Sequence, residues 1–285
     1  MVHFGPSGNS DSFYADGHKS SLEMPEWLNK QGLNAYEYQC SKGVKISADT
    51  ANKLGNKAKE NDILLSIHSP YYINLATDDE EKRLKSVDYI MQTLRAANDM
   101  GADRIVVHSG ACAKMDRKVA LEYAKKTLTI ARDAAKSEGL LHIHICPETM
   151  GKINQLGDLD EVMELCLVDD TFLPTIDFGH LNARTFGGLK TYEEFLHIFD
   201  TIENKLGFDR LNIFHSHFSK IEYTVPGGEK KHLTFADDVY GPDFNYVAEI
   251  VYKKNLSPVF ICESDGTMAE DAKKMQGMYL QFGGR

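Results

Sequence analysis

Short apolar runs alternate along this chain with longer segments of helical periodicity. We predict strands in eight of the runs: 2–5, 33–39, 63–69, 104–110, 141–148, 173–180, 210–218 and 257–264. Between them, helices are predicted over about 21–32, 49–61, 79–100, 117–138, 158–167, 191–206, 243–254 and 268–282. Strands that alternate with helices in this way favour a parallel sheet.

Eight strand–helix units in one chain predict a (β/α)8 TIM barrel. Nothing in the composition marks a linker, so we expect a single barrel domain over 1–285. The alternative is a doubly wound open sheet, but no Gly-x-Gly-x-x-Gly follows the first strand.

Bulk composition adds few constraints. Of the 285 residues, 42% are hydrophobic and 26% are charged, as in ordinary globular proteins. The five cysteines form no Cys-x-x-Cys pair, which argues against a disulfide framework and against a cysteine zinc site. The net charge of −10 argues against a broad basic surface but leaves room for a local positive site. With no membrane-length apolar stretch and no basic leader, we expect a soluble cytoplasmic protein.

Polar residues end six consecutive predicted strands. A TIM barrel carries its chemistry at these carboxyl ends, so the side chains should converge at one mouth. The residues are His68, His108, Glu148, Asp177, His217 and Glu263, with His180 three positions after Asp177. Any one of them alone would more often be a core or rim residue, or a helix cap.

Taken together, the set predicts a metal site. Imidazoles and carboxylates without thiolates are the ligands that zinc or manganese selects. Without a cation, the three carboxylates would place like charges in one mouth, which would cost on the order of several kcal/mol. His215 shares the face of His217 but lies one pleat deeper, so we expect a supporting role for it. The same role, at most, is expected for His142 and His144.

Six motifs resemble endonuclease IV, the zinc-dependent apurinic/apyrimidinic endonuclease family. In order and spacing they match across the third to eighth predicted strands: HSPYYINLA (68–76), VVHSGA (106–111), PETMG (147–151), IDFGHLNA (176–183), HSHFSK (215–220) and ICES (261–264). The wider superfamily, which includes xylose-isomerase-like sugar isomerases and epimerases, shares the barrel and part of the metal set.

The resemblance implies a ligand set and a reaction. His68, His108 and Glu148 would hold one zinc, and Glu148 would bridge to a second zinc held by Asp177, His217 and Glu263. His180 and His232 would belong to a third. The implied activity is hydrolysis of the phosphodiester 5′ to an abasic site in double-stranded DNA, with Glu148, Glu263 and Tyr71 at the reacting centre.

Three segments depart from the family pattern. Lys230 stands where the third zinc normally has an aspartate, Glu229 is one residue out of register, and Asp237 or Asp238 could reach in from the next loop. Two zinc ions are therefore expected, and the third site is either absent or has altered ligands. The loop after the second strand reads CSKGVKIS, in which Lys42 and Lys45 are either phosphate contacts or surface lysines. The family's late Gly-Glu-Gly loop is replaced by VYGPDF (239–244).

Two other functions fit a metal-bearing barrel. One is a metal-dependent isomerase or epimerase of a free or phosphorylated sugar, a class that typically centres on one metal with fewer histidines. The other is a non-enzymatic, metal-stabilised binding protein, which explains an open ring of ligands poorly. The ligand set favours the nuclease, acting as a monomer on DNA.

Overall fold

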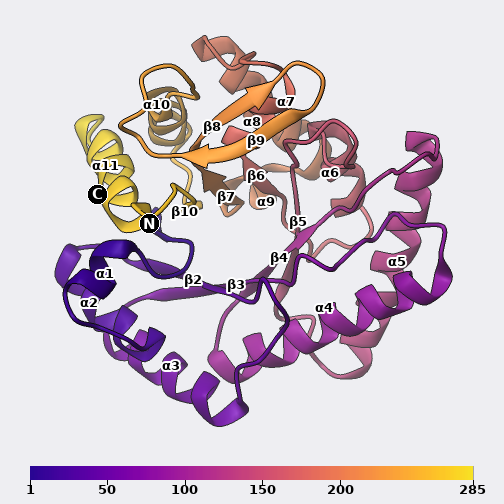
Figure 1. Cartoon of the computed structure of the whole chain (residues 1–285), viewed down its shortest axis with the longest axis horizontal. Helices are drawn as coiled ribbons and strands as arrows, with labels where there is room; N and C mark the ends of the chain where they lie inside the picture. The colour runs from indigo at the N-terminus through magenta and orange to yellow at the C-terminus, as the bar shows by residue number, and fades with distance from the viewer. Residues whose placement is uncertain (285) are drawn as a thin grey trace.

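The computed structural model describes residues 1–284 and shows a parallel barrel wrapped by helices (Figure 1). Eight strands form one sheet in the order β1-β10-β7-β6-β5-β4-β3-β2. Their bounds are β1 His3–Pro6, β2 Ala35–Gln39, β3 Leu64–His68, β4 Arg104–His108, β5 His144–Glu148, β6 Thr175–Asp177, β7 His215–Phe218 and β10 Val259–Cys262. The barrel predicted from the alternation of strands and helices is confirmed.

Close backbone approach joins the first two strands and nearly closes the barrel. Ser7, just past β1, forms a parallel bridge with Glu37 of β2. Gly5 makes this approach possible, because a Cβ at that position would lie 1.8 Å from the carbonyl oxygen of Ala35. A larger residue at position 5 would therefore force the two strands apart.

The outer helices follow the predicted amphipathic segments. They are α1 Asp11–Ala15, α2 Met24–Gln31, α3 Ala48–Glu60, α4 Glu80–Met100, α5 Arg117–Ser137, α6 Leu159–Cys166, α7 Phe178–Arg184, α8 Tyr192–Leu206, α9 Phe208–Asn212, α10 Phe244–Lys254 and α11 Met268–Gln281. Helix α4 illustrates why its segment is helical. The Asp79 side chain accepts a bond from the Lys82 amide at its start, and Gly101 ends it in the left-handed region at φ +71°.

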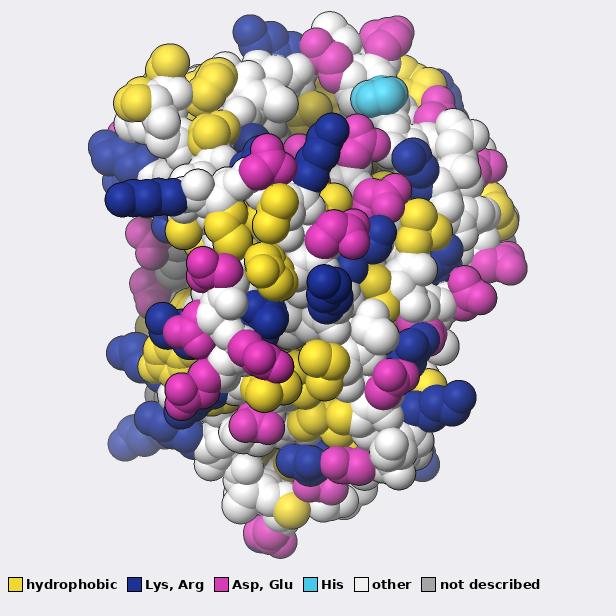
Figure 2. All heavy atoms as spheres, turned by 90° about the vertical axis from the view of Figure 1, so that its right-hand side faces the viewer, with side chains coloured by type: hydrophobic (Ala, Val, Ile, Leu, Met, Phe, Trp, Pro, Cys, Tyr) yellow, Lys and Arg dark blue, Asp and Glu magenta, His cyan; other side chains and the backbone are white. Residues whose placement is uncertain are grey.

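The outer surface of this helical layer is mixed in charge. Figure 2 shows the side on which α4 and α5 lie, where lysine, arginine and acidic side chains are interspersed with hydrophobic ones. Within residues 1–284, no helix has both the length and the apolar composition needed to cross a membrane.

Several predicted boundaries were wrong. The segment 210–218 begins as helix α9 and becomes strand only at His215, and the run 173–180 is strand only over Thr175–Asp177 before helix α7 begins at Phe178. Between β7 and α10, where no strand was predicted, the chain forms a two-stranded antiparallel hairpin, β8 Lys220–Thr224 and β9 Gly228–Leu233. An apolar run does not distinguish a buried helical turn from a strand, which explains the first two errors.

Candidate metal centre

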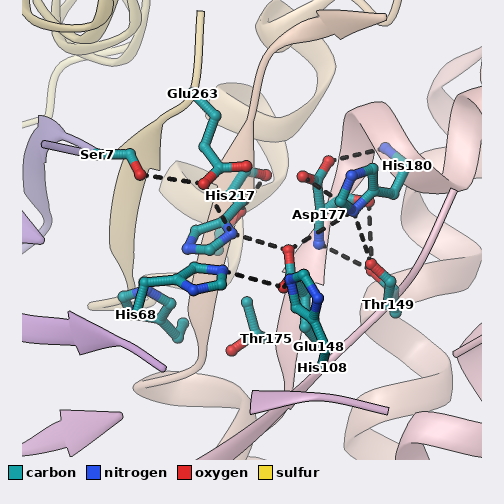
Figure 3. A network of polar contacts seen from close by, with 12 residues as sticks. Ser7, His68, His108, Glu148, Thr149, Thr175, Asp177, His180, His217 and Glu263 are labelled. Carbon is teal, nitrogen blue, oxygen red and sulfur yellow. Dashed lines mark hydrogen bonds and ion pairs between the residues drawn. The ribbon is translucent and has the colours of Figure 1, made fainter. Parts of the chain in front are cut away.

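The predicted ring of strand-end residues assembles at the carboxyl end of the barrel (Figure 3). Strand register explains the convergence, because parallel pairing sets His108 beside Glu148 and Asp177 beside His217. His68, Glu148, Asp177 and His217 are buried, whereas the side chain of Glu263 is partly exposed.

Glu148 lies at the centre of this arrangement, with one oxygen facing each half of the ring. Its Oε2 lies 3.2 Å from His108 Nε2 and 3.6 Å from His68 Nε2. Its Oε1 lies 2.9 Å from His217 Nδ1 on the other side. A carboxylate in this position can bridge two cations, as the resemblance implied.

The second half of the ring is richer in carboxylates. Ligand atoms of Glu148, Asp177, His217 and Glu263 all lie within 4.8 Å of one another. Ser7 donates a hydrogen bond of 3.0 Å to Glu263 Oε1 and helps to orient that side chain. Asp177 Oδ1 accepts the His180 amide at 2.7 Å, so Oδ2 is left to face the cluster.

A third group forms where α7 meets the β8–β9 hairpin. It consists of His180, His232 and Glu229, whose ligand atoms also lie within 4.8 Å of one another. Glu229 Oε2 is 3.5 Å from His180 Nε2, and its Oε1 is 4.0 Å from His232 Nε2.

A β-bulge brings the Glu229 side chain to the same side of the hairpin as His232. Glu222 pairs with Lys231 and Tyr223 pairs with Glu229, so Lys230 is the extra residue on β9. Residues three apart in a strand normally face opposite sides, but one inserted residue returns Glu229 to the side of His232. Lys230 instead contacts Glu222 at 2.5 Å.

Asp237 and Asp238 do not join the third group. Asp237 accepts bonds from the amides of Val239 and Tyr240 within its own loop, and none of the ligand groups found in residues 1–284 includes either aspartate. Neither aspartate therefore supplies the acidic member of the third group, because the bulge brings Glu229 there instead.

Three of the candidate ligand histidines are held through Nδ1 by a backbone carbonyl or a hydroxyl. In His180 this nitrogen also lies 3.2 Å from Asp177 Oδ2. His68 Nδ1 lies 2.8 Å from the Ser69 carbonyl, and His180 Nδ1 lies 2.9 Å from the Thr149 carbonyl. His232 Nδ1 lies 2.9 Å from Ser219 Oγ. A proton on each Nδ1 leaves the Nε2 lone pair free for a cation, which is the usual support of metal-ligating histidine.

Electrostatics within the cluster favour a cation. Burial lowers the pKa of His180, but the Asp177 and Glu229 carboxylates outweigh it and raise the pKa to about 9. For His217, burial acts in the same direction and the surrounding carboxylates again prevail, which raises its pKa well above the ordinary value. Burial raises the pKa of Asp177. The carboxylates thus attract positive charge and favour protonated His180 and His217 when no metal is bound.

Unpartnered atoms show that the residues fit a metal ion. Glu148 Oε2 and Asp177 Oδ2 are buried and accept no hydrogen bond within the described chain. In residues 1–284, the ion-pair partners of Glu148, Asp177, Glu229 and Glu263 are all histidines. Buried carboxylates without a lysine or arginine partner, facing imidazole nitrogens, form a donor set suited to zinc or manganese.

Tyr71 stands at the opening of the cluster, with 55% of its surface exposed. Its ring stacks on that of His108 at 5.3 Å between centroids, so it borders any molecule that reaches the cluster. A cavity of about 550 Å³ opens here, lined by residues that include Gln39, Tyr71, His232 and Glu263. Lys42 and Lys45 are exposed in the neighbouring loop.

The three histidines that were predicted to support the cluster differ in their contacts. His215 is buried, and its Nε2 bonds to Glu37 Oε2 at 2.9 Å. His142 is exposed and precedes β5, while His144 begins β5 and bonds to the Thr171 carbonyl, so neither supports the cluster. Sequence reasoning missed Glu37, although a lone carboxylate inside the apolar run 33–39 was the available signal.

The fold and the ligand ring define a TIM barrel with a candidate metal centre at its carboxyl end. Residues 25–278 match the family model described as xylose isomerase-like TIM barrel, and the chain belongs to this family.

Two sequence relatives illustrate the range of the family. The chain is 38% identical over 267 residues to the uncharacterized protein MJ0133 of Methanocaldococcus jannaschii, covering 93% of this chain and 92% of that one. It is 30% identical over 183 residues to a Mycoplasma pneumoniae protein named "probable endonuclease 4", covering 62% and 60% of the two chains.

The fold is shared by solved structures of proteins that are named for two different activities. A D-tagatose 3-epimerase-like protein superposes with a TM-score of 0.72 at 19% identity, covering 98% of this chain and 97% of that one. Endonuclease IV from Thermus thermophilus superposes with a TM-score of 0.62 at 16% identity, covering 99% and 97%. At these identities, the likeness is one of fold.

Proposed function

We propose that this chain is a metal-dependent apurinic/apyrimidinic endonuclease, which hydrolyses the phosphodiester 5′ to an abasic site in double-stranded DNA. The observation that carries the proposal is the third ligand group. His180, His232 and Glu229 extend the ring beyond what a single-metal sugar enzyme needs, and the bulge at Lys230 provides the acidic ligand that the sequence lacks at the expected position.

The proposed ligands are those that the resemblance implied, with Glu229 added. His68, His108 and Glu148 would hold one zinc ion, Glu148 would be shared with a second at Asp177, His217 and Glu263, and the third group would hold another; manganese is the alternative metal. When bound, such a cluster supplies Lewis-acid stabilisation of the charge that develops on phosphate oxygens, and it activates water near neutral pH.

The chain's own residues provide the rest of the proposed chemistry. Glu263, oriented by Ser7 at the edge of the cavity, is placed to accept a proton from water or to fix its direction of attack. Tyr71, stacked on His108 and half exposed, would pack against the sugar or base next to the scissile bond. We also propose that the protein acts as a monomer in the cytoplasm, where its five buried thiols would stay reduced.

A sugar isomerase or epimerase is the second candidate, and one observation favours it. The cavity of about 550 Å³ beside Tyr71 has the size typical of a small-molecule site.

One experiment separates the two candidates. Metal-loaded protein is incubated with a labelled duplex that carries one tetrahydrofuran abasic analogue, which resists β-elimination, with Glu263→Gln protein as the control. A strand break immediately 5′ to the analogue, absent in the control, is the expected result. An intact duplex, together with metal measured in the protein, would contradict the nuclease and favour a sugar substrate.

A further inference from the structure

Glu37 is a buried carboxylate at the floor of the candidate metal centre. It lies on β2 with none of its surface exposed. Within residues 1–284 its ion-pair partners are the two histidines of β7, His215 and His217. A buried charge is costly unless it is paired, so the burial of Glu37 between two histidines indicates a specific role for its carboxylate.

The contacts of Glu37 connect two strands to a metal ligand. Its Oε2 accepts a hydrogen bond from Ser66 Oγ on the neighbouring strand and lies 2.9 Å from His215 Nε2. These contacts fix the carboxylate and leave Oε1 beside His217 Nε2 at 2.9 Å. His217 Nε2 makes no hydrogen bond in the described chain, and Glu37 Oε1, which also accepts a bond of 3.4 Å from Gln39 Nε2, is the acceptor atom that lies beside it.

His217 thus lies between Glu37 on one side and the carboxylates of the cluster on the other. Its Nδ1 faces the cluster, 2.9 Å from Glu148 Oε1 and 3.6 Å from Glu263 Oε1 (Figure 3). The orientation is opposite to that of His68, His180 and His232, which are held through Nδ1 by a carbonyl or a hydroxyl. His217 therefore needs an acceptor on the Nε2 side, and that acceptor is a full negative charge.

We propose that Glu37 is a positioning residue that keeps the proton of His217 on Nε2 and so presents Nδ1 to the metal. The proposal rests on the metal-dependent function proposed above. A carboxylate behind a ligating histidine fixes its tautomer and raises its basicity, and loss of such a partner typically weakens metal affinity by about 10–100-fold. Glu37 does not touch substrate in this role.

The same atoms permit one other reading. Ligand atoms of Glu37, His215 and His217 lie within 4.8 Å of one another, which is compatible with a metal held directly by all three. In that case His217 would offer Nε2 rather than Nδ1 to this deeper ion. The two readings differ in the number of ions bound and in the tautomer of His217.

Zinc affinity and stoichiometry test the proposal, measured on chelator-stripped protein by competition with a zinc-binding dye and by elemental analysis. The variant is Glu37→Gln, whose amide has one acceptor and cannot serve both histidines. The matched control is Glu161→Gln, which removes another buried carboxylate, paired with Arg117 on the outer layer. Thermal unfolding of the metal-free proteins gives the purely structural effect of each change.

The expected result is a roughly 10–100-fold loss of affinity at one zinc site in Glu37→Gln, with full stoichiometry at saturating zinc and no such loss in Glu161→Gln. Unchanged affinity in Glu37→Gln would overturn the proposal. Permanent loss of one equivalent, with the other sites unchanged, would also overturn it and make Glu37 a ligand. Wild-type protein that binds neither zinc nor manganese would instead overturn the proposed function.

A measurement on unaltered protein covers the case in which Glu37→Gln does not fold. Nitrogen-15 spectra of histidine-labelled, zinc-loaded protein report which ring nitrogen of His217 carries the proton. A proton on Nε2 is expected, and a proton on Nδ1 would overturn the proposal. Glu37→Asp, which retains the charge but shortens the side chain, should weaken the same site by less than Glu37→Gln does.

Discussion

Replacing Glu229 with glutamine should weaken the third ligand group selectively. The substitution removes the only carboxylate among His180, His232 and Glu229 while preserving side-chain size. The two imidazoles keep their supports on Thr149 and Ser219, so the fold of the hairpin should be retained.

The pKa of His180 sets the size of the effect. Its pKa rises from 6.5 to about 9 although burial acts in the opposite direction, a net change of about 3 kcal/mol, so the interaction with the surrounding carboxylates exceeds that amount. Asp177 contributes most and Glu229 next, so we assign about 1 kcal/mol to Glu229 for a single positive charge. A doubly charged ion doubles that Coulomb energy to about 2 kcal/mol, and direct contact increases it. We therefore expect an affinity loss of at least about thirtyfold.

Elemental analysis after dialysis against a chelator of graded strength is the assay. Glu229→Gln should lose one ion at a chelator strength at which wild-type protein retains it. Glu222→Gln is the matched control, since Glu222 lies on the same hairpin and contacts Lys230 instead of the histidines. Equal metal retention in Glu229→Gln and wild type, or equal metal loss in the Glu229→Gln and Glu222→Gln variants, would contradict the assignment of Glu229 to the third ligand group.

Four further outcomes follow from the site. Glu263→Gln should lower turnover at least about a hundredfold while circular dichroism stays unchanged, because the residue is partly exposed and its loss leaves the barrel core intact. Chelation should abolish turnover and lower the unfolding temperature, and titration with zinc or manganese should restore both and identify the preferred metal. In metal-free protein, the pKa of His180 in the folded state is about 9, above its ordinary value of 6.5. The stabilisation that protonated His180 provides is therefore complete below pH 6.5 and is lost as pH rises through 9. Urea unfolding across that range should show the decline in the free energy of unfolding. Tyr71→Ala should raise KM without changing the free energy of unfolding, because the ring is 55% exposed. A lower free energy of unfolding in this variant would assign the ring a structural role instead.

Zinc binding itself should tighten with rising pH. Each imidazolium in the cluster must lose its proton before it can ligate, and the carboxylates raise the pKa values of His180 and His217. Between pH 6.5 and 9, the zinc affinity of the folded protein should therefore rise while the free energy of unfolding of the metal-free protein falls.

Periodicity in the sequence was sufficient for the barrel and for most of its mouth. Alternating apolar runs and amphipathic segments specify strand–helix units, and parallel strands in one barrel must bring their carboxyl ends together. His68, His108, Glu148, Asp177, His217 and Glu263 could thus be placed in one ring from their positions along the chain, and the structure brings them together there.

Tertiary structure alone decided the remaining parts of the site. A bulge depends on how two strands pair, so no reading of GGEKKH by itself could show that Lys230 is the extra residue and that Glu229 faces His180. Glu37 and His215 are 178 residues apart and meet only because the barrel nearly closes and turns β2 toward β7. The sequence determined which side chains end the strands, because strand ends are local. The partners of those side chains depend on register and closure, which are properties of the assembled barrel.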